Sequence, residues 1–233
     1  MTLLFENEYR ALVIGASGAI GRAFVCALQE DLNCVHIEMV SRSNCSGFDL
    51  LDMTSVAEQA VASAGTGPYH FIVDATGALT IEGVGPEKSL AVVHPDVLLK
   101  AFQLNAIGPL MVLRHFAPLL APGPSIYAKL SARVGSITDN HKGGWYGYRA
   151  SKAALNMFLQ TAAIELQRKN AQLRVVALQP GTVRSDLSRP FFAGVAKLLD
   201  ADESVAGMLA ALQSLQPRQG AHFLDYQGNE IPW

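Results

Sequence analysis

Cysteine, charge and long apolar runs are all scarce in this sequence. Its 233 residues include only three cysteines, an odd number without the spacing of a metal site, and 16% charged residues. Lysine and arginine total 18 against 20 aspartate and glutamate, so nothing suggests nucleic acid or an anionic membrane as a partner. No apolar run approaches the ~18 residues of a membrane span, and the N-terminus lacks a signal-peptide pattern. We therefore expect a cytoplasmic protein with reduced thiols and no bound metal.

What the sequence does have is a regular alternation of strand-like and helix-like runs. Half of the residues are hydrophobic, enough to bury a substantial core in one domain of this length. The alternation predicts an α/β fold, a doubly wound (Rossmann) domain with a seven-stranded, mainly parallel sheet and helices on both faces. We expect a single domain over residues 1–233, with a small substrate lid at about 187–200. The expected strands are residues 10–14, 34–40, 48–50, 69–74, 125–130, 173–178 and 221–226.

A glycine-rich turn follows the first expected strand. The run Gly15-Ala16-Ser17-Gly18-Ala19-Ile20-Gly21 lies between that strand and a helical segment. Backbone N–H groups and the positive end of a helix bind phosphate at such a turn, and glycine lets the backbone approach a pyrophosphate closely. The spacing differs from the strict G-x-G-x-x-G pattern, so an ordinary strand-to-helix turn stays open as the alternative.

The end of the second expected strand indicates which dinucleotide would bind. An acidic residue about 20 residues past the glycine turn would bind the ribose 2′-hydroxyl of NAD. The sequence has Ser41 and then Arg42 at this point. Because arginine pairs with a 2′-phosphate through charge-assisted hydrogen bonds, the sequence favours NADP(H).

Tyr148 and Lys152 are four residues apart in a helical segment, which places them on one helix face. A phenol has an ordinary pKa near ~10, and a positive charge beside it favours the phenolate and lowers that pKa. Such a pair can move a proton at a substrate oxygen, as carbonyl reduction requires. Asn105 lies in another helical segment, where a buried amide is costly unless it is used.

Together these motifs resemble the short-chain dehydrogenase/reductase family over essentially the whole chain. More narrowly, they are similar to its C-factor-like and sniffer-like carbonyl reductases. The chain departs from the family's pattern at two positions. Ala19 stands where the cofactor turn of the family has its middle glycine, and Asp74 stands where its Asn-Ala-Gly turn has asparagine. Besides the glycine turn, the resemblance rests on Asp74-Ala75-Thr76-Gly77, Asn105, Tyr148, Lys152, Ser131-Ala132-Arg133-Val134-Gly135-Ser136-Ile137, Gly143-Gly144-Trp145-Tyr146, Pro180-Gly181-Thr182-Val183-Arg184-Ser185 and Ile231-Pro232-Trp233.

The resemblance implies hydride transfer between NADP(H) and a carbonyl or alcohol substrate. Tyr148 would be the general acid/base, and Lys152 would lower its pKa and hold the nicotinamide ribose. Asn105 would support a water path for proton supply. The alternative is an NADP(H)-binding signalling or regulatory protein with little or no turnover. The substituted serine described next and the Asp74 turn favour that reading.

The catalytic serine of the family falls where this chain has Ala132. Ser131 is adjacent, but a regular strand would direct it to the opposite side, unless a bulge brings it round. Ser136, in the following turn, could supply the hydroxyl in its place. Both serines therefore remain candidates.

The resemblance also implies a set of cofactor contacts and a small-molecule substrate, in a homo-dimer or homo-tetramer. The implied contacts are Gly15, Ser17, Gly18, Ala19, Ile20, Ser41, Arg42, Asp49, Leu50, Ala75, Thr76, Gly77, Pro180, Gly181, Val183 and Ser185.

Overall fold

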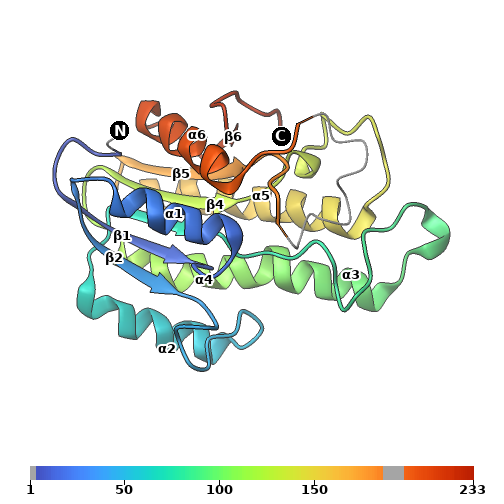
Figure 1. Ribbon diagram of the computed structural model, residues 1–233. Helices are drawn as coiled ribbons and strands as arrows, with labels where there is room; N and C mark the ends of the chain where they lie inside the picture. The colour runs from blue at the N-terminus through green and yellow to red at the C-terminus, as the bar shows by residue number, and fades with distance from the viewer. Residues whose placement is uncertain (1–3, 186–196) are drawn as a thin grey trace.

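The computed structural model describes residues 4–185 and 197–233, in which six parallel strands form one sheet (Figure 1). The strand order is β2-β1-β3-β4-β5-β6. The winding direction reverses between β1 and β3, and ligands of such sheets bind at this switch point, beyond the carboxyl ends of the strands. The strands are β1 (Tyr9–Ile14), β2 (Cys34–Val40), β3 (Phe71–Asp74), β4 (Ser125–Leu130), β5 (Leu173–Gln179) and β6 (His222–Asp225).

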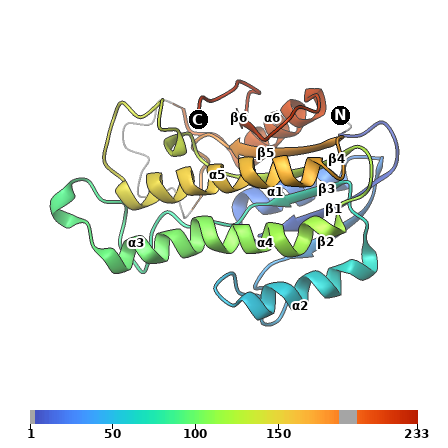
Figure 2. The ribbon, with the colours of Figure 1, turned by 180° about the vertical axis from the view of Figure 1, so that it is seen from behind.

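Helices cover both faces of this sheet, as predicted. On the face toward the viewer in Figure 1 lie α1 (Ala19–Gln29) and α6 (Ala201–Ser214). Figure 2 shows the opposite face, which is covered by the other helices. These are α2 (Met53–Ser63), α4 (Gly108–Phe116) and α5 (Tyr146–Gln167), with α3 (Pro95–Phe102) leading into α4 through a π-helical turn, η3 (Gln103–Ile107).

The two faces bury separate hydrophobic clusters because strand side chains alternate. Leu12 and Ile14 of β1 pack toward α2, α4 and α5, where they meet Phe116. Val13 points the other way, toward Phe24 of α1. All five side chains are fully buried, and each such burial stabilises the fold by about 1.5–3 kcal/mol. This core holds the carboxyl ends of the strands, and so the site, in fixed positions.

One predicted strand is wrong. Residues 48–50 form a turn, and the described sheet has six strands where we expected seven. Gly47 has φ +86°, and the Asp49 carboxylate accepts a hydrogen bond from the backbone N–H of Leu51 (2.9 Å). A side chain that bonds its own backbone two residues on makes a turn rather than a strand. The predicted lid falls mostly on residues 186–196, which lie outside the described residues.

One helical stretch, Pro95–Leu119, is long and apolar enough to cross a membrane by length and composition alone. Here α4 lies against the sheet, and Val112, Leu113 and Phe116 are among the core residues. A core helix of a folded domain has this same composition.

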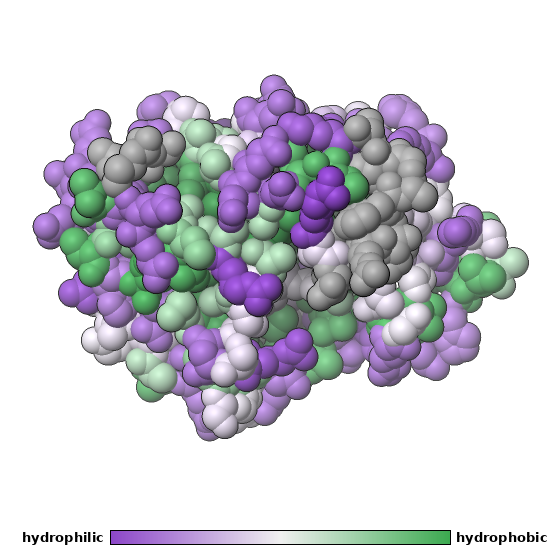
Figure 3. Space-filling model, in the orientation of Figure 1, coloured by the Kyte–Doolittle hydropathy of each residue, from purple (hydrophilic) through white to green (hydrophobic). Residues whose placement is uncertain are grey.

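The edge strand β2 carries exposed apolar side chains on the α1 side of the sheet. Val35 and Met39 are 52% and 44% exposed. Figure 3 shows hydrophobic residues scattered among hydrophilic ones on this face. Scattered exposure of this kind is normal on protein surfaces, so we assign no binding role to this face.

Candidate active site

A cavity of about 320 Å³ lies at the carboxyl ends of β1, β2 and β3, next to the switch point. The structure brings ten of the predicted cofactor residues together around it. It also adds three apolar residues that no motif marked, Phe48, Ala78 and Leu104. The ten predicted residues in its lining are Gly15, Ser17, Gly18, Ser41, Arg42, Asp49, Leu50, Ala75, Thr76 and Gly77.

The glycine turn forms one wall of this cavity, and two of its glycines could not be replaced. Gly15 has φ +83°, and a Cβ on Gly21 would lie 2.1 Å from the Gly15 carbonyl oxygen. The N-cap residue of α1 is Gly18, which offers no side-chain cap and so leaves the N-terminal N–H groups of the helix for a ligand. This cradle fits a pyrophosphate. Ala19 and Ile20 form the first turn of α1 and do not line the cavity.

The loop after β2 presents a cation beside this cradle. Arg42 is exposed and lines the cavity. Ser41 is buried, and its hydroxyl is hydrogen-bonded to the Ser43 hydroxyl (2.9 Å) and to the Asn44 side chain. Ser41 therefore helps to shape the loop, while the Arg42 guanidinium is free of that network and can reach a phosphate.

Tyr148 and Lys152 lie one turn apart on α5, with the Lys152 Nζ atom 5.8 Å from the centroid of the Tyr148 ring. Lys152 is buried, and its Nζ donates a hydrogen bond to the carbonyl oxygen of Leu130 (3.1 Å). A Cβ added to Gly77 would lie 3.5 Å from the same Nζ. Lys152 therefore connects the tyrosine to the wall of the cofactor cavity.

Burial shifts the pKa values of these two side chains in opposite directions. It raises the pKa of Tyr148 to about 12. It lowers the pKa of Lys152 to about 7, an effect that the charge of Lys129 increases and that of Asp74 opposes. Burial disfavours whichever form is charged. The expectation that Lys152 lowers the pKa of Tyr148 is wrong for the free protein, because desolvation dominates both groups.

Asn105 lies in the π-helical turn between α3 and α4, and its buried amide is used. Its Oδ1 accepts from the Ala78 N–H and its Nδ2 donates to the Ala78 carbonyl, both at 2.8 Å. Nδ2 also lies 3.5 Å from the Ser151 hydroxyl. π-Turns are common at functional sites. Here the amide fixes the chain just after Gly77, at the edge of the cofactor cavity.

Both candidate serines are buried in the turn region that follows β4. The Ser131 hydroxyl donates to Oδ1 of Asn156 (2.6 Å), on the same helix face as Tyr148 and Lys152 but one turn further on. The Ser136 hydroxyl accepts from the Asp139 N–H (2.9 Å), which leaves its proton available to a carbonyl oxygen. Because a hydroxyl has one proton, Ser131 would have to release Asn156 before it could donate to a substrate oxygen, whereas Ser136 would not.

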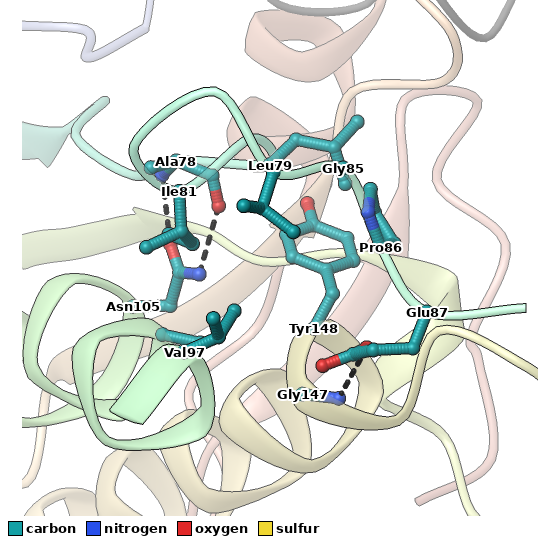
Figure 4. A pocket seen from close by; sticks show the side chains of 12 residues that line it. Ala78, Leu79, Ile81, Gly85, Pro86, Glu87, Val97, Asn105, Gly147 and Tyr148 are labelled. Atoms are coloured by element: carbon teal, nitrogen blue, oxygen red, sulfur yellow. Dashed lines mark hydrogen bonds between the residues drawn. The ribbon is translucent and has the colours of Figure 1, made fainter. Parts of the chain in front are cut away.

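A loop from Ala78 to Glu87 covers the tyrosine. Figure 4 shows the Tyr148 side chain pointing toward Leu79 and Gly85 of this loop. The cavity enclosed there measures about 10 Å³, roughly the space of one water molecule. The Glu87 carboxylate, which no motif marked, accepts a hydrogen bond from the Gly147 N–H (3.0 Å; Figure 4). A substrate that reaches Tyr148 from this side requires the loop to move.

The Pro180–Ser185 segment follows β5 and does not line the cofactor cavity described above. The Ser204 hydroxyl donates to the Pro180 carbonyl (2.6 Å). Gly181 has φ +75°, and a Cβ there would lie 2.6 Å from the Leu199 side chain. Val183 forms a β-bridge with Leu199. The segment is therefore held at the carboxyl end of β5.

Comparison with known proteins identifies the family. The short chain dehydrogenase family model matches residues 9–196. The chain belongs to this family. It is 35% identical to the C-signal protein of Myxococcus xanthus over 169 residues, which cover 72% of this chain and 95% of that protein. The predicted family and its C-factor-like subgroup are thus confirmed.

Solved structures share the fold of this chain. The carbonyl reductase Sniffer of D. melanogaster aligns with a TM-score of 0.82 and 21% identity, covering 97% of this chain and all of that one. An NADPH-bound carbonyl reductase from chicken fatty liver aligns with a TM-score of 0.83 and 22% identity, covering 97% and 95%. The predicted α/β fold is confirmed.

Proposed function

We propose that this protein is an NADP(H)-dependent oxidoreductase that interconverts a carbonyl and an alcohol. One observation carries the proposal: Lys152 joins the Tyr148 helix to Gly77, in the wall of the cavity that would bind the dinucleotide. An acid/base pair and a phosphate cradle thus meet at the switch point. Family membership supports the same class of activity.

The residues around the cavity would hold the cofactor by distinct chemistry. The Gly15–Gly21 turn and the start of α1 would bind the pyrophosphate through backbone N–H groups. Arg42 would pair with the 2′-phosphate that distinguishes NADP(H) from NAD(H). The NADPH bound to the chicken carbonyl reductase supports this assignment. Ala75, Thr76 and Gly77 would face the adenosine side. When bound, NADPH supplies the hydride, and the chain supplies binding, orientation and proton transfer.

Tyr148 would give its phenolic proton to the substrate oxygen as negative charge develops there. Burial raises the pKa of Tyr148, which keeps the phenol protonated in the free protein but makes it a weaker acid, so proton transfer would depend on a positive charge that stabilises the phenolate. Lys152 would bind the nicotinamide ribose and stabilise the phenolate that remains. A hydroxyl of Ser131 or Ser136 would donate to the same substrate oxygen. Asn105 would support the path by which the phenolate regains a proton.

The substrate would be a small carbonyl or alcohol compound, as befits the family. The cavity beside Tyr148 offers it apolar walls, with Leu79 and Ile81 from the loop and Val97 from α3. We place the protein in the cytoplasm as a homo-dimer or homo-tetramer, with neither nucleic acid nor membrane as partner. The even charge balance supports the absence of nucleic acid.

The alternative is an NADP(H)-binding protein with little turnover. It is favoured by Ala132, at the family's serine position, and by the similarity to C-signal. A direct NADPH titration, combined with NADPH depletion over aldehydes, ketones and quinones, separates the two. Enzymatic function predicts binding together with depletion for at least one carbonyl class. Binding without depletion across the panel would make the binding protein the better account.

A further inference from the structure

Lys129 is a completely buried lysine in β4 to which no motif drew attention. Its Nζ contacts four oxygens on two residues. They are Oδ1 of Asp74 (3.1 Å), the Asp74 carbonyl (3.3 Å), the Thr76 carbonyl (2.5 Å) and the Thr76 hydroxyl (3.2 Å). The ammonium is therefore well satisfied in a dry environment, and its partners are the last residue of β3 and the turn that follows it.

Asp74 completes a clamp on that turn. Its Oδ1 also accepts from the Thr76 N–H (2.9 Å) and from the Thr76 hydroxyl (2.6 Å). Both Asp74 and Lys129 have no exposed side-chain surface. Burying such a pair costs about as much desolvation energy as its attraction returns. Stability is therefore a weak reason for the pair, and its position is the more informative feature.

The clamped turn is shared by the cofactor cavity and by Lys152. Thr76 and Gly77 line the cavity, and the Lys152 Nζ lies against Gly77. Lys152 in turn donates to the carbonyl of Leu130, the residue after Lys129. Two lysines, one from the sheet and one from α5, thus converge on a single turn.

We propose that Lys129 is a positioning residue for the reaction: with Asp74 it fixes the 75–77 turn against the cofactor, and its charge adds to the burial that disfavours the charged form of Lys152. The cofactor half of this inference rests on the proposed function, whereas the effect on Lys152 belongs to the free protein. Burial lowers the pKa of Lys152 to about 7, with Lys129 as the next contribution and Asp74 opposing it. The other ionisable group facing Lys152 is Tyr148, which is neutral near pH 7 because burial raises its pKa to about 12.

The first test is the titration of Lys152 in the free wild-type protein. The chain has seven lysines, so ¹³Cε-labelled lysine gives a tractable NMR spectrum, and the Lys152→Met variant assigns the signal. We expect a midpoint near neutral pH. A midpoint within about one pH unit of the ordinary lysine pKa of ~10.4 would overturn the proposal. This test needs no variant of Lys129.

The second test removes both charges of the clamp together. Asp74→Asn/Lys129→Met leaves no unpaired buried charge, so it folds where Lys129→Met alone could fail. Because Lys129 contributes more than Asp74, the Lys152 midpoint should rise. Lys169→Met, which removes an exposed lysine of the segment after α5, should leave it unchanged. An unchanged or lowered midpoint in the folded double variant contradicts the proposal.

The third readout is NADPH affinity. In the double variant we expect NADPH to bind about tenfold more weakly at pH 6, because the turn that faces it is no longer clamped. Equal affinities for the double variant and the wild type would overturn the positioning role. If the wild type itself fails to bind NADPH, the proposed function fails, while the Lys152 titration still decides the effect of Lys129.

Discussion

The carboxylate of Glu87 accepts a hydrogen bond from the backbone N–H of Gly147, one residue before Tyr148. The Glu87 carbonyl also accepts from the Trp145 N–H (2.5 Å). Trp145 has φ +56°, an uncommon conformation for a large side chain, and it precedes α5 without a side-chain cap of its own. A residue 60 positions away thus caps the helix that carries the acid/base pair.

Replacing this cap should affect both stability and turnover. Glu87→Ala leaves the Gly147 N–H without its acceptor, which should cost about 1–2 kcal/mol of unfolding free energy. Turnover should fall with it, since Tyr148 lies in the first turn of α5. Glu87→Gln keeps an acceptor oxygen and is the matched control. Urea denaturation and steady-state rates measure both effects, and an alanine variant indistinguishable from the glutamine variant would show that the cap is dispensable.

The sequence predicted features that local patterns control. The Gly15–Gly21 turn and the Tyr148/Lys152 face follow from residue spacing within one turn or one helix. Glu87 and Lys129 could not be found in this way. Their partners, Gly147 and Asp74, are 60 and 55 residues distant in the chain, and only the folded sheet brings them together.

Two expectations from the sequence were wrong, each for its own physical reason. Residues 48–50 have an apolar strand-like composition, yet Asp49 bonds its own backbone and turns the chain. The sign of the Tyr148 pKa shift was wrong because helix spacing reports proximity and not burial. The pKa of Tyr148 is raised by desolvation, which a sequence does not display.

The lowered pKa of Lys152 predicts how stability of the free protein depends on pH. In the folded protein Lys152 loses its proton near pH 7, whereas in the unfolded chain it does so near its ordinary 10.5. Between these values unfolding takes up a proton, so stability should rise with pH. The rise from this group is at most about 5 kcal/mol.

Lys152→Met removes this contribution and is the direct test. Unfolding free energies at about pH 7 and pH 9.5 should differ by a few kcal/mol more in the wild type than in the variant. Lys169→Met, an exposed lysine, controls for loss of one positive charge. If the unfolding free energies of the wild type and of Lys152→Met change with pH in parallel, Lys152 keeps its charge in the folded protein and the prediction is wrong.

Arg42 should determine the choice of cofactor. We expect NADPH to bind at least ~10-fold tighter than NADH, about 1.4 kcal/mol. Arg42→Ala should remove most of that preference while leaving NADH affinity nearly unchanged, because only the 2′-phosphate contact is lost. Arg168→Ala, at the far end of α5, is the control. Calorimetric titration with both nucleotides checks this, and equal wild-type affinities would contradict the assignment.

The two serines can be separated by their rates. The hydroxyl that donates to the substrate oxygen stabilises developing charge, so its loss should lower kcat by about 10²–10³, or ~3 kcal/mol. Only one of Ser131→Ala and Ser136→Ala should show this effect. For Ser131 a matched Asn156→Ala variant separates catalysis from the hydrogen bond to α5. Two variants with near-wild-type rates would leave the protein without a catalytic serine.

The central claim is that Tyr148 is the proton donor next to a bound NADPH. Tyr148→Phe removes one hydroxyl and retains the ring that packs near Trp145 and Lys152. Steady-state reduction of an accepted carbonyl, measured beside a direct NADPH titration of the same variant, tests the claim. We predict wild-type NADPH affinity and a rate lower by several orders of magnitude, because the alkoxide would form without a positioned acid. Undiminished turnover in Tyr148→Phe would contradict the account.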